Sequence, residues 1–495
     1  MVDNKNILIK IVAPFCGLWL SVAKALSSDY NVVVLCEGST GKRLVEETIP
    51  DVNVVVEVKD EYYMKNEILQ VDIMDEVVSR ERKYGETFSL LCSMDRALGK
   101  GYLFNATMTP DQGMTWWPHK KKLKKILDDF VYWEYIIDKY SPALILGHAH
   151  IKILSILSRH NKIKYLCVLK ARYGHKWMWS ENEYTQNVEF AEKVKDNVSK
   201  FSNVEKGSHL EYIRDNASLR DLSQVSFDFK TLLKKAVRIF VYDSYRKLRQ
   251  TYNEDKYKPW AWLPIIFRSY FRYKYFLEYG KKPDDLKGYK IVFFTLCKEP
   301  EQSLLEYAPE FNNSMEIISW VSKSLQADTL LVIRENPHSY GIRSKQFHDN
   351  LRSMGNVVLA HPEISSWEWI KRSKLVVTIV GTVGVEAVYF DKPVITFSRY
   401  YEIGYLPTVR YADSYYTTNE ATNELLSLSE NSRFFEISKR SLYHAQMDVA
   451  FEMKDFMKLN RSKSLHMDYA KIIVEDLKIR YLSSMSKCNS NELTE

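Results

Sequence analysis

The stretch that decides the fold is Leu375 to Phe397, which reads LVVTIVGTVGVEAVYFDKPVITF. Leu375–Val380 is an apolar, β-branched run without polar alternation, as expected of a parallel strand buried on both faces. Val385–Phe390 continues in helical register until Asp391-Lys392-Pro393 ends the helix. Val394–Phe397 is a second buried strand. The stretch therefore predicts one βαβ unit.

Two glycines, Gly381 and Gly384, lie in the turn between the first strand and the helix. The backbone N–H groups of such a turn and the helix dipole favour an anion, for example a nucleotide phosphate. The alternative is that both glycines only allow the helix to pack tightly on the strand. An isolated pair of glycines leaves both interpretations open.

The remaining sequence alternates strands and helices in the same way and predicts two Rossmann-like α/β domains that face a cleft. In the first domain we expect strands at 7–12, 31–36, 52–58, 143–146 and 164–168. The predicted organisation is a first Rossmann-like domain (1–180), a helical basic and aromatic insert with its linker (181–283), a second Rossmann-like domain (284–435), C-terminal helices that pack back on the first domain (436–482) and a disordered tail (483–495).

Composition excludes several classes of protein. The six cysteines are scattered without a C-x-x-C pair, which argues against a zinc site and suits a reducing compartment. We find no Asp-x-Asp pair, and we expect neither metal nor cofactor. The apolar run 11–23 is interrupted by Pro14 and Gly17 and is followed by a strand, which favours strand, loop and helix over a signal peptide. No run is long enough to span a membrane, and the sequence predicts a cytoplasmic protein.

Positive charge is concentrated in one segment. The whole chain carries +7, whereas residues 230–282 hold 14 Lys and Arg against 4 Asp and Glu, a balance of +10 that leaves −3 elsewhere. Basic and aromatic side chains interleave there, which is typical of a protein that lies peripherally on anionic lipid. The candidate membrane-facing residues are Lys234, Lys235, Arg238, Trp260 and Trp262. The alternative is a pair of linking helices whose aromatics pack inward. No nucleic-acid-binding module is recognisable, and we expect no nucleic-acid partner.

Polar residues follow four consecutive strand ends or helix starts in the second domain. Because parallel strands bind ligands at their carboxyl ends, these residues predict one donor pocket. They are Glu299, Glu301, Arg334, Asn336, His338, Ser365, Ser366, Gly381, Thr382, Gly384 and Glu386.

Candidates for acid–base chemistry come from the first part of the chain. Asp95 lies in the polar, glycine-containing run Ser93–Tyr102 and is the first choice for a base or nucleophile. A capping or surface role is the alternative. His148 and His150, just past a predicted strand, are further candidates. Arg96 and Arg172 could bind an anionic acceptor group.

The order of the motifs resembles a known family. FFTLCKEPE (293–301), VIRENP (332–337) and GTVGVEA (381–387) with DKPVITF (391–397) are similar to the capsule polysaccharide biosynthesis family. That family includes bacterial transferases of 3-deoxy-manno-octulosonic acid (Kdo), which use a cytidine monophosphate donor and have the two-domain GT-B fold. The resemblance implies a donor in the second domain and an acceptor in the first. It further implies that Glu301 contacts the donor ribose, and that Ser365, Ser366, Thr382 and Gly384 surround the phosphate or base.

One position departs from the family pattern, because Asn336 precedes Pro337 where the family has histidine. Asparagine still forms hydrogen bonds but supplies no positive charge. The sequence favours a glycosyltransferase of bacterial surface polysaccharide, of capsule or O-antigen type, at the inner face of the membrane. Its expected partners are a nucleotide-sugar donor such as CMP-Kdo, a glycan or glycolipid acceptor and an anionic membrane surface. A nucleotide-sugar 2-epimerase and a non-catalytic assembly protein remain alternatives.

Overall fold

The structure is a computed structural model of the chain. It describes residues 6–11, 16–52, 54–65, 73–95, 98–99, 114, 116–203, 210–213, 227–249, 260, 262–298, 302–311, 313–429, 432–454, 459 and 464–482. The chain forms two compact units. Unit 1 comprises Met1–Glu86, Lys124–Asn187 and Val449–Glu495, and unit 2 comprises Thr87–Leu123 and Val188–Asp448.

Unit 1 is built on a seven-stranded sheet with the order β13-β6-β5-β4-β1-β2-β3. Its strands are β1 (Asn6–Lys10), β2 (Asn31–Cys36), β3 (Val54–Val58), β4 (Leu144–Gly147), β5 (Lys164–Lys170), β6 (Lys176–Ser180) and β13 (Phe451–Glu452). Its helices are α1 (Gly17–Leu26), α2 (Ser39–Thr48), α3 (Lys59–Lys65), α4 (Ile73–Tyr84), α6 (His119–Tyr140, which begins in unit 2), α7 (Lys152–His160) and α20 (Met467–Leu477). β1 to β5 are parallel, and β6 and β13 add two antiparallel strands at one edge.

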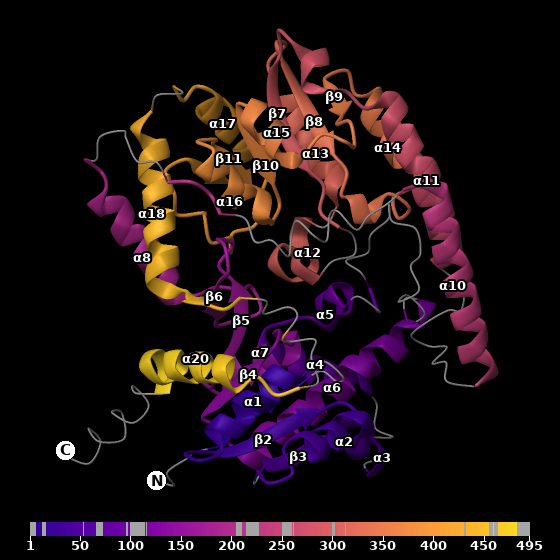
Figure 1. The fold of residues 1–495 in the computed structure, drawn as a ribbon, viewed down its shortest axis with the longest axis vertical. Coiled ribbons are helices and arrows are strands. Elements are labelled where there is room, and N and C mark those ends of the chain that lie inside the picture. The colour runs from indigo at the N-terminus through magenta and orange to yellow at the C-terminus, as the bar shows by residue number, and fades with distance from the viewer. Residues whose placement is uncertain are drawn as a thin grey trace. The chain divides into compact units, whose positions relative to one another are not determined.

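Both faces of this sheet are covered. Alternate side chains of β1, Ile7 and Ile9, belong to one core with α1 and α20, whereas Lys10 points into a cavity beside α6. Helix α20 packs along α1, as Figure 1 shows. A covered sheet needs apolar side chains on both faces, which explains the near-continuous apolar runs of β1, β2 and β4. Helix α20, which lies in the predicted C-terminal segment 436–482, therefore belongs to unit 1.

Unit 2 is built on a six-stranded parallel sheet with the order β12-β11-β10-β7-β8-β9. Its strands are β7 (Lys290–Thr295), β8 (Thr329–Arg334), β9 (Val357–Leu359), β10 (Leu375–Thr378), β11 (Val394–Thr396) and β12 (Val409–Tyr411). Its helices are α5 (Phe88–Met94), α8 (Val188–Lys200), α10 (Phe229–Leu248), α11 (Trp262–Tyr279), α12 (Gln302–Tyr307), α13 (Ser314–Ser324), α14 (Lys345–Ser353), α15 (Ser366–Arg372), α16 (Thr382–Tyr389), α17 (Tyr415–Leu426) and α18 (Arg433–Val449).

The strand order identifies the fold. In chain order the strands of unit 2 lie 3-2-1-4-5-6, and those of unit 1 begin 3-2-1-4-5, which is the Rossmann arrangement in both. The predicted fold class of two Rossmann-like domains is therefore confirmed. The predicted βαβ unit is also present, with β10 and β11 parallel neighbours. Its helix, however, begins at Thr382 rather than at Val385, so that Gly384 lies inside α16.

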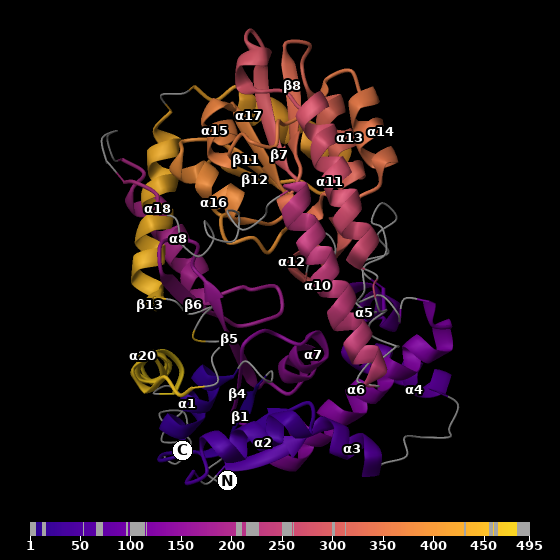
Figure 2. The ribbon, with the colours of Figure 1, turned by 45° about the vertical axis from the view of Figure 1, so that its right-hand side comes forward.

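The predicted helical insert contains two long helices, α10 and α11, which lie side by side in Figure 2. Helix α11 buries Phe276 in the core of unit 2, so part of the aromatic content does pack inward. Helix α10 buries mainly Leu232 and Ala236 against α11. The compact units differ from the predicted domain boundaries, because α5 groups with the second sheet and α18 also stays in unit 2. The predicted tail, residues 483–495, lies outside the described residues.

Candidate functional site

The second sheet reverses its strand order between β7 and β10, and this is where a doubly wound sheet opens a ligand site. Residues from both strand ends meet there. Cys297, just after β7, donates a hydrogen bond from Sγ to the carbonyl oxygen of Val380, just after β10, over 3.5 Å. The loops that follow the two central strands are therefore held together at the switch point.

The glycine turn begins helix α16 beside this contact. Gly381 occupies the N-cap position without a side-chain cap, and Thr382 is the exposed first helical residue. The first N–H groups of a helix have no intrahelical acceptor and favour an anion. Gly384 has a different role: a Cβ there would stand 2.8 Å from Cε1 and Oη of Tyr401. Gly384 is buried and serves packing, whereas Gly381 and Thr382 present the open helix start.

Tyr401 fixes this turn from the loop after β11. Its hydroxyl donates a hydrogen bond to the carbonyl oxygen of Gly381, and its ring lies over Gly384. Tyr401 is not among the residues that the sequence predicted for the donor pocket. The run Ser398-Arg399-Tyr400-Tyr401 directly after an apolar strand was the available signal, because it too marks a strand end.

A buried charged cluster holds the loop after β8. Arg343 pairs with Glu335 and donates from Nη2 to the carbonyl oxygen of Cys297 at 2.6 Å. His348 Nε2 lies 2.9 Å from the other oxygen of Glu335, and Asn336 N donates to this carboxylate at 2.7 Å. Burial alone would raise the pKa of Glu335, but Arg343 and His348 outweigh it and hold that pKa below its usual value. The cluster thus ties the β7 and β8 loops into one rigid edge.

The predicted donor residues on this edge divide into local caps and open groups. Asn336 Oδ1 accepts a hydrogen bond from His338 N at 3.0 Å, so its side chain closes its own turn, and His338 is exposed. Arg334 Nε donates to the carbonyl oxygen of Ile364 at 3.3 Å, which places it beside the start of α15. Ser365 caps that helix by accepting from Glu368 N at 3.2 Å.

The remaining predicted donor residues contribute less to an open surface. Ser366 and Glu386 are buried, and the side chain of Glu386, a residue of α16, is completely buried. Complete burial suits a side chain that anchors its own helix turn, the alternative role of Glu386, better than one that contacts a ligand. Glu299 and Glu301 lie outside the described residues, as does Arg96. Of these, Glu301 is the residue for which the resemblance implies a contact with the ribose.

Asp95 lies in unit 2, although the sequence analysis placed it in the first domain. It follows α5 and is exposed, and its Oδ1 accepts a hydrogen bond from Leu98 N at 2.8 Å. One carboxylate oxygen therefore caps a turn. Helix α5 contacts α12, the helix that follows the β7 loop. Asp95 thus belongs to the same compact body as the switch point.

The two histidine candidates lie in unit 1, after β4. His150 is buried, with Nε2 2.9 Å from Ser180 Oγ and Nδ1 3.4 Å from Ser155 Oγ. Burial lowers the pKa of His150 to about 4, which keeps the imidazole neutral at pH 7. These contacts favour a structural role for His150. His148 is half-buried in the same turn and is the more accessible of the two.

Arg172 lies in the hairpin between β5 and β6, at the carboxyl end of β5. Its φ of +57° is uncommon for a residue with a side chain. The guanidinium group is half-buried. Arg172 thus lies at the carboxyl edge of the first sheet.

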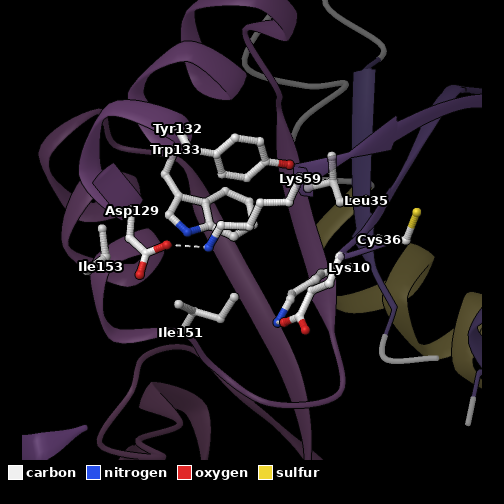
Figure 3. Close-up of a pocket in the computed structure, with 10 residues that line it drawn as sticks. Lys10, Leu35, Cys36, Lys59, Asp129, Tyr132, Trp133, Ile151 and Ile153 are labelled. Atoms are coloured by element: carbon white, nitrogen blue, oxygen red, sulfur yellow. Dashed lines mark hydrogen bonds and ion pairs between the residues drawn. The ribbon is translucent and has the colours of Figure 1, made fainter. Parts of the chain in front are cut away.

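Unit 1 also contains a cavity of about 140 Å³ beneath α6 (Figure 3). Its lining includes Lys10 at the end of β1, Lys59 at the start of α3, and Asp129, Tyr132 and Trp133 of α6. None of these five residues is among the sequence-predicted site residues. Lys10 was the signal for the cavity, because a lysine near the end of an otherwise apolar, doubly covered strand has an unusual environment.

The predicted membrane-facing residues lie on or beside α10. Lys234, Lys235 and Arg238 are on its solvent side, and apolar side chains accompany them. Trp260 is half-buried and packs on α10, because its Nε1 donates to Ser244 Oγ at 3.3 Å and its backbone N–H to Asp243. Trp262 is half-buried at the start of α11. Within the described part of the chain, no helix combines the length and apolarity needed to cross a membrane.

Comparisons with known proteins leave the family open. Neither models of protein families nor curated proteins match the chain. Among solved structures it is similar to UDP-GlcNAc 2-epimerase of Methanocaldococcus jannaschii in complex with UDP-GlcNAc and UDP (12% identity, 89% of this chain and 99% of that one, TM-score 0.27). It is also similar to the N-terminal domain of Candida albicans trehalose-6-phosphate phosphatase (10% identity, 96% of this chain and 97% of that one, TM-score 0.32). A third similar structure is a spinosyn rhamnosyltransferase complexed with spinosyn aglycone (7% identity, 89% of this chain and 96% of that one, TM-score 0.28). These TM-scores are too low to support an argument about this chain. The fold assignment therefore rests on the strand order alone.

Proposed function

We propose that this chain is a metal-independent glycosyltransferase that binds a nucleotide-sugar donor at the carboxyl edge of the second sheet. The observation that carries the proposal is the hydrogen bond from Cys297 to Val380 at the switch point, beside the uncapped start of α16. Rossmann sheets bind nucleotides at this place, with the phosphate at a helix N-terminus. The motif resemblance to the capsule polysaccharide biosynthesis family supports the same edge.

The phosphate of the donor would lie at Gly381 and Thr382. Arg334, half-buried at the end of β8, is a cation among the strand-end residues predicted for the donor site. Asn336 supplies no charge, and its side-chain oxygen is used by the turn. We therefore assign phosphate neutralisation to the helix start and Arg334. Asp95 is the proposed base, supported by its place in unit 2 and by the contact of α5 with α12.

The lipid-facing part of the proposal rests on α10. Phe229, Leu233, Val237, Phe240 and Val241 are exposed at spacings of four, three and one residues, so they form one apolar stripe of the helix. Lys234 and Arg238 flank the stripe. An exposed apolar stripe bordered by cations suits the surface of an anionic membrane. A lipid-linked acceptor at the inner face of a bacterial membrane, for surface polysaccharide synthesis, would explain this surface better than a soluble epimerase.

The test is a panel of nucleotides with the full chain. Thermal shifts are measured with CMP, CDP, UDP, GDP and ADP, because a ligand that binds the folded state raises its stability by mass action. Stabilisation by CMP would support a CMP-Kdo donor, and stabilisation by UDP alone would replace Kdo with another sugar. Release of the nucleotide from its sugar only when an acceptor glycan is present distinguishes transfer from epimerisation. Absence of any shift would contradict the proposal and favour an assembly protein.

A further inference from the structure

The cavity of unit 1 contains more buried positive than buried negative charge. The side chains of Lys10, Lys59 and Asp129 are 14%, 18% and 16% exposed, respectively. Figure 3 shows both lysines extending toward the cavity, Lys10 from β1 and Lys59 from the start of α3. Two buried ammonium groups therefore face one buried carboxylate.

Asp129 is already committed to other donors. It pairs with Lys59, accepts a hydrogen bond from Tyr63 Oη at 2.9 Å and one from Lys125 Nζ at 2.6 Å. Lys59 is held further by aromatic rings, with its Nζ 5.3 Å from the centroid of Tyr132 and 5.6 Å from that of Trp133. Asp129 and Lys59 thus satisfy each other.

The ion pair of Lys10 is weaker than that of Lys59. The ion-pair partner of Lys10 is Glu37, whose carboxylate is 3.8 Å away and whose side chain is 69% exposed. An exposed partner at this distance is screened by solvent and stabilises a buried ammonium little. Asp129 also favours the charged form of Lys10, but Lys59, which is paired with Asp129, opposes it. Leu35, Ile151 and Ile153 add apolar side chains to the same cavity wall.

We propose that this cavity binds the anionic group of a small molecule, a carboxylate or a phosphate, with Lys10 as the cation that holds it. The cavity lies at the carboxyl end of β1 and β2, the edge at which parallel sheets bind ligands. A volume of about 140 Å³ accommodates a group of a few non-hydrogen atoms, and not a whole nucleotide.

The electrostatics of Lys10 agree with this assignment. Burial lowers the pKa of Lys10, and Glu37 offsets the effect only in part. An anion beside the ammonium group would supply the missing counter-charge. The inference is independent of the proposed donor site, because every residue that carries it belongs to unit 1.

The test measures anion binding to the full chain by calorimetry, with sodium chloride at matched ionic strength as the reference. The probes are inorganic phosphate, glucose 6-phosphate and glucuronate. We expect saturable binding of at least one probe. Binding of the two phosphates assigns a phosphoryl group, and binding of glucuronate alone assigns a sugar carboxylate. Lys10→Met should weaken that binding about tenfold or more, since a charge-assisted contact is lost.

Lys24→Met is the matched control, because Lys24 is exposed on α1 of the same unit, and its binding should equal that of the wild type. A second measurement needs no variant: amine labelling of the wild-type protein is followed by mass spectrometry. The bound probe should slow labelling of Lys10 and leave Lys24 unchanged. The proposal is overturned if no probe binds saturably, if both variants bind alike, or if the probe does not protect Lys10.

Discussion

Tyr401 lies so close to Gly384 that a Cβ at residue 384 would stand 2.8 Å from the tyrosine ring and hydroxyl. The same hydroxyl binds the carbonyl oxygen of Gly381. The side chain of Tyr401 thus packs against the start of α16 and also forms a hydrogen bond with the turn that precedes it. The shape of the proposed phosphate site consequently depends on a residue from the next strand's loop.

Gly384→Ala should destabilise the protein by about 1–3 kcal/mol, because the added methyl group overpacks the contact with Tyr401. The measurement is the free energy of unfolding from urea titration. In a Tyr401→Ala background the same substitution should cost much less, since its steric partner is gone. Equal costs in the two backgrounds would contradict the contact.

Thr382→Glu should abolish the nucleotide-induced thermal shift without lowering the stability of the free protein. A carboxylate at the first helical position interacts favourably with the helix dipole and stabilises the fold by about 0.3–1 kcal/mol, but it repels a phosphate at the same place. Thr382→Gln is the matched neutral variant and should retain most of the shift. A full nucleotide shift with Thr382→Glu would place the phosphate elsewhere.

Asp95→Asn should lower turnover about 10²–10⁴-fold if the carboxylate is the general base. Asparagine keeps an oxygen for the hydrogen bond from Leu98 N, so the turn and the melting temperature should be preserved. The rate is measured as nucleotide release in the presence of donor and acceptor. Undiminished turnover would leave Asp95 with its capping role alone and direct attention to His148.

Acid should weaken unit 1 through His150. The folded state holds its pKa at about 4, below the ordinary value of 6.5, so the unfolded chain binds the proton first. The contribution is present at pH 7 and is lost as the pH falls from 6.5 towards 4, by up to about 3 kcal/mol.

The check for His150 is urea unfolding at several pH values, for the wild type and for His150→Gln. Glutamine can still form a hydrogen bond with Ser180 but does not titrate. The difference in stability between the two proteins should shrink with acid across this window. A difference that is constant between pH 7 and pH 4 would show that His150 does not titrate as expected.

Removing three charges of α10 with Lys234→Gln, Lys235→Gln and Arg238→Gln should reduce sedimentation with anionic vesicles, since each basic residue near such a surface contributes about 1 kcal/mol. The control removes three exposed lysines of the same unit that lie outside the basic segment, with Lys287→Gln, Lys323→Gln and Lys345→Gln. That control has the same net charge and should bind like the wild type. Equal loss in both triple variants would mean that only total charge matters, and no loss would refute the membrane surface.

The sequence predicted most strands of both sheets because their signal is local. Apolar β-branched runs such as Leu375–Val380 identify buried parallel strands wherever they pair. It also predicted the polar ends of β8 and β10. The start of α16 was missed, since glycines at 381 and 384 both suggest a turn, whereas Gly384 is helical. Its lack of a side chain is explained only by Tyr401.

The sequence by itself determined the two α/β series, the basic helices and the polar residues at strand ends. The tertiary structure decided which of those residues meet. Strand β7 pairs not only with β8, the next strand in the chain, but also with the distant strand β10. That pairing brings Cys297 to Val380 and puts Arg343 between Cys297 and Glu335. Likewise, only the packing of α6 on the first sheet brings Asp129 to Lys59 and encloses Lys10. Periodicity and propensity act over a few residues, whereas strand order and burial depend on the whole fold.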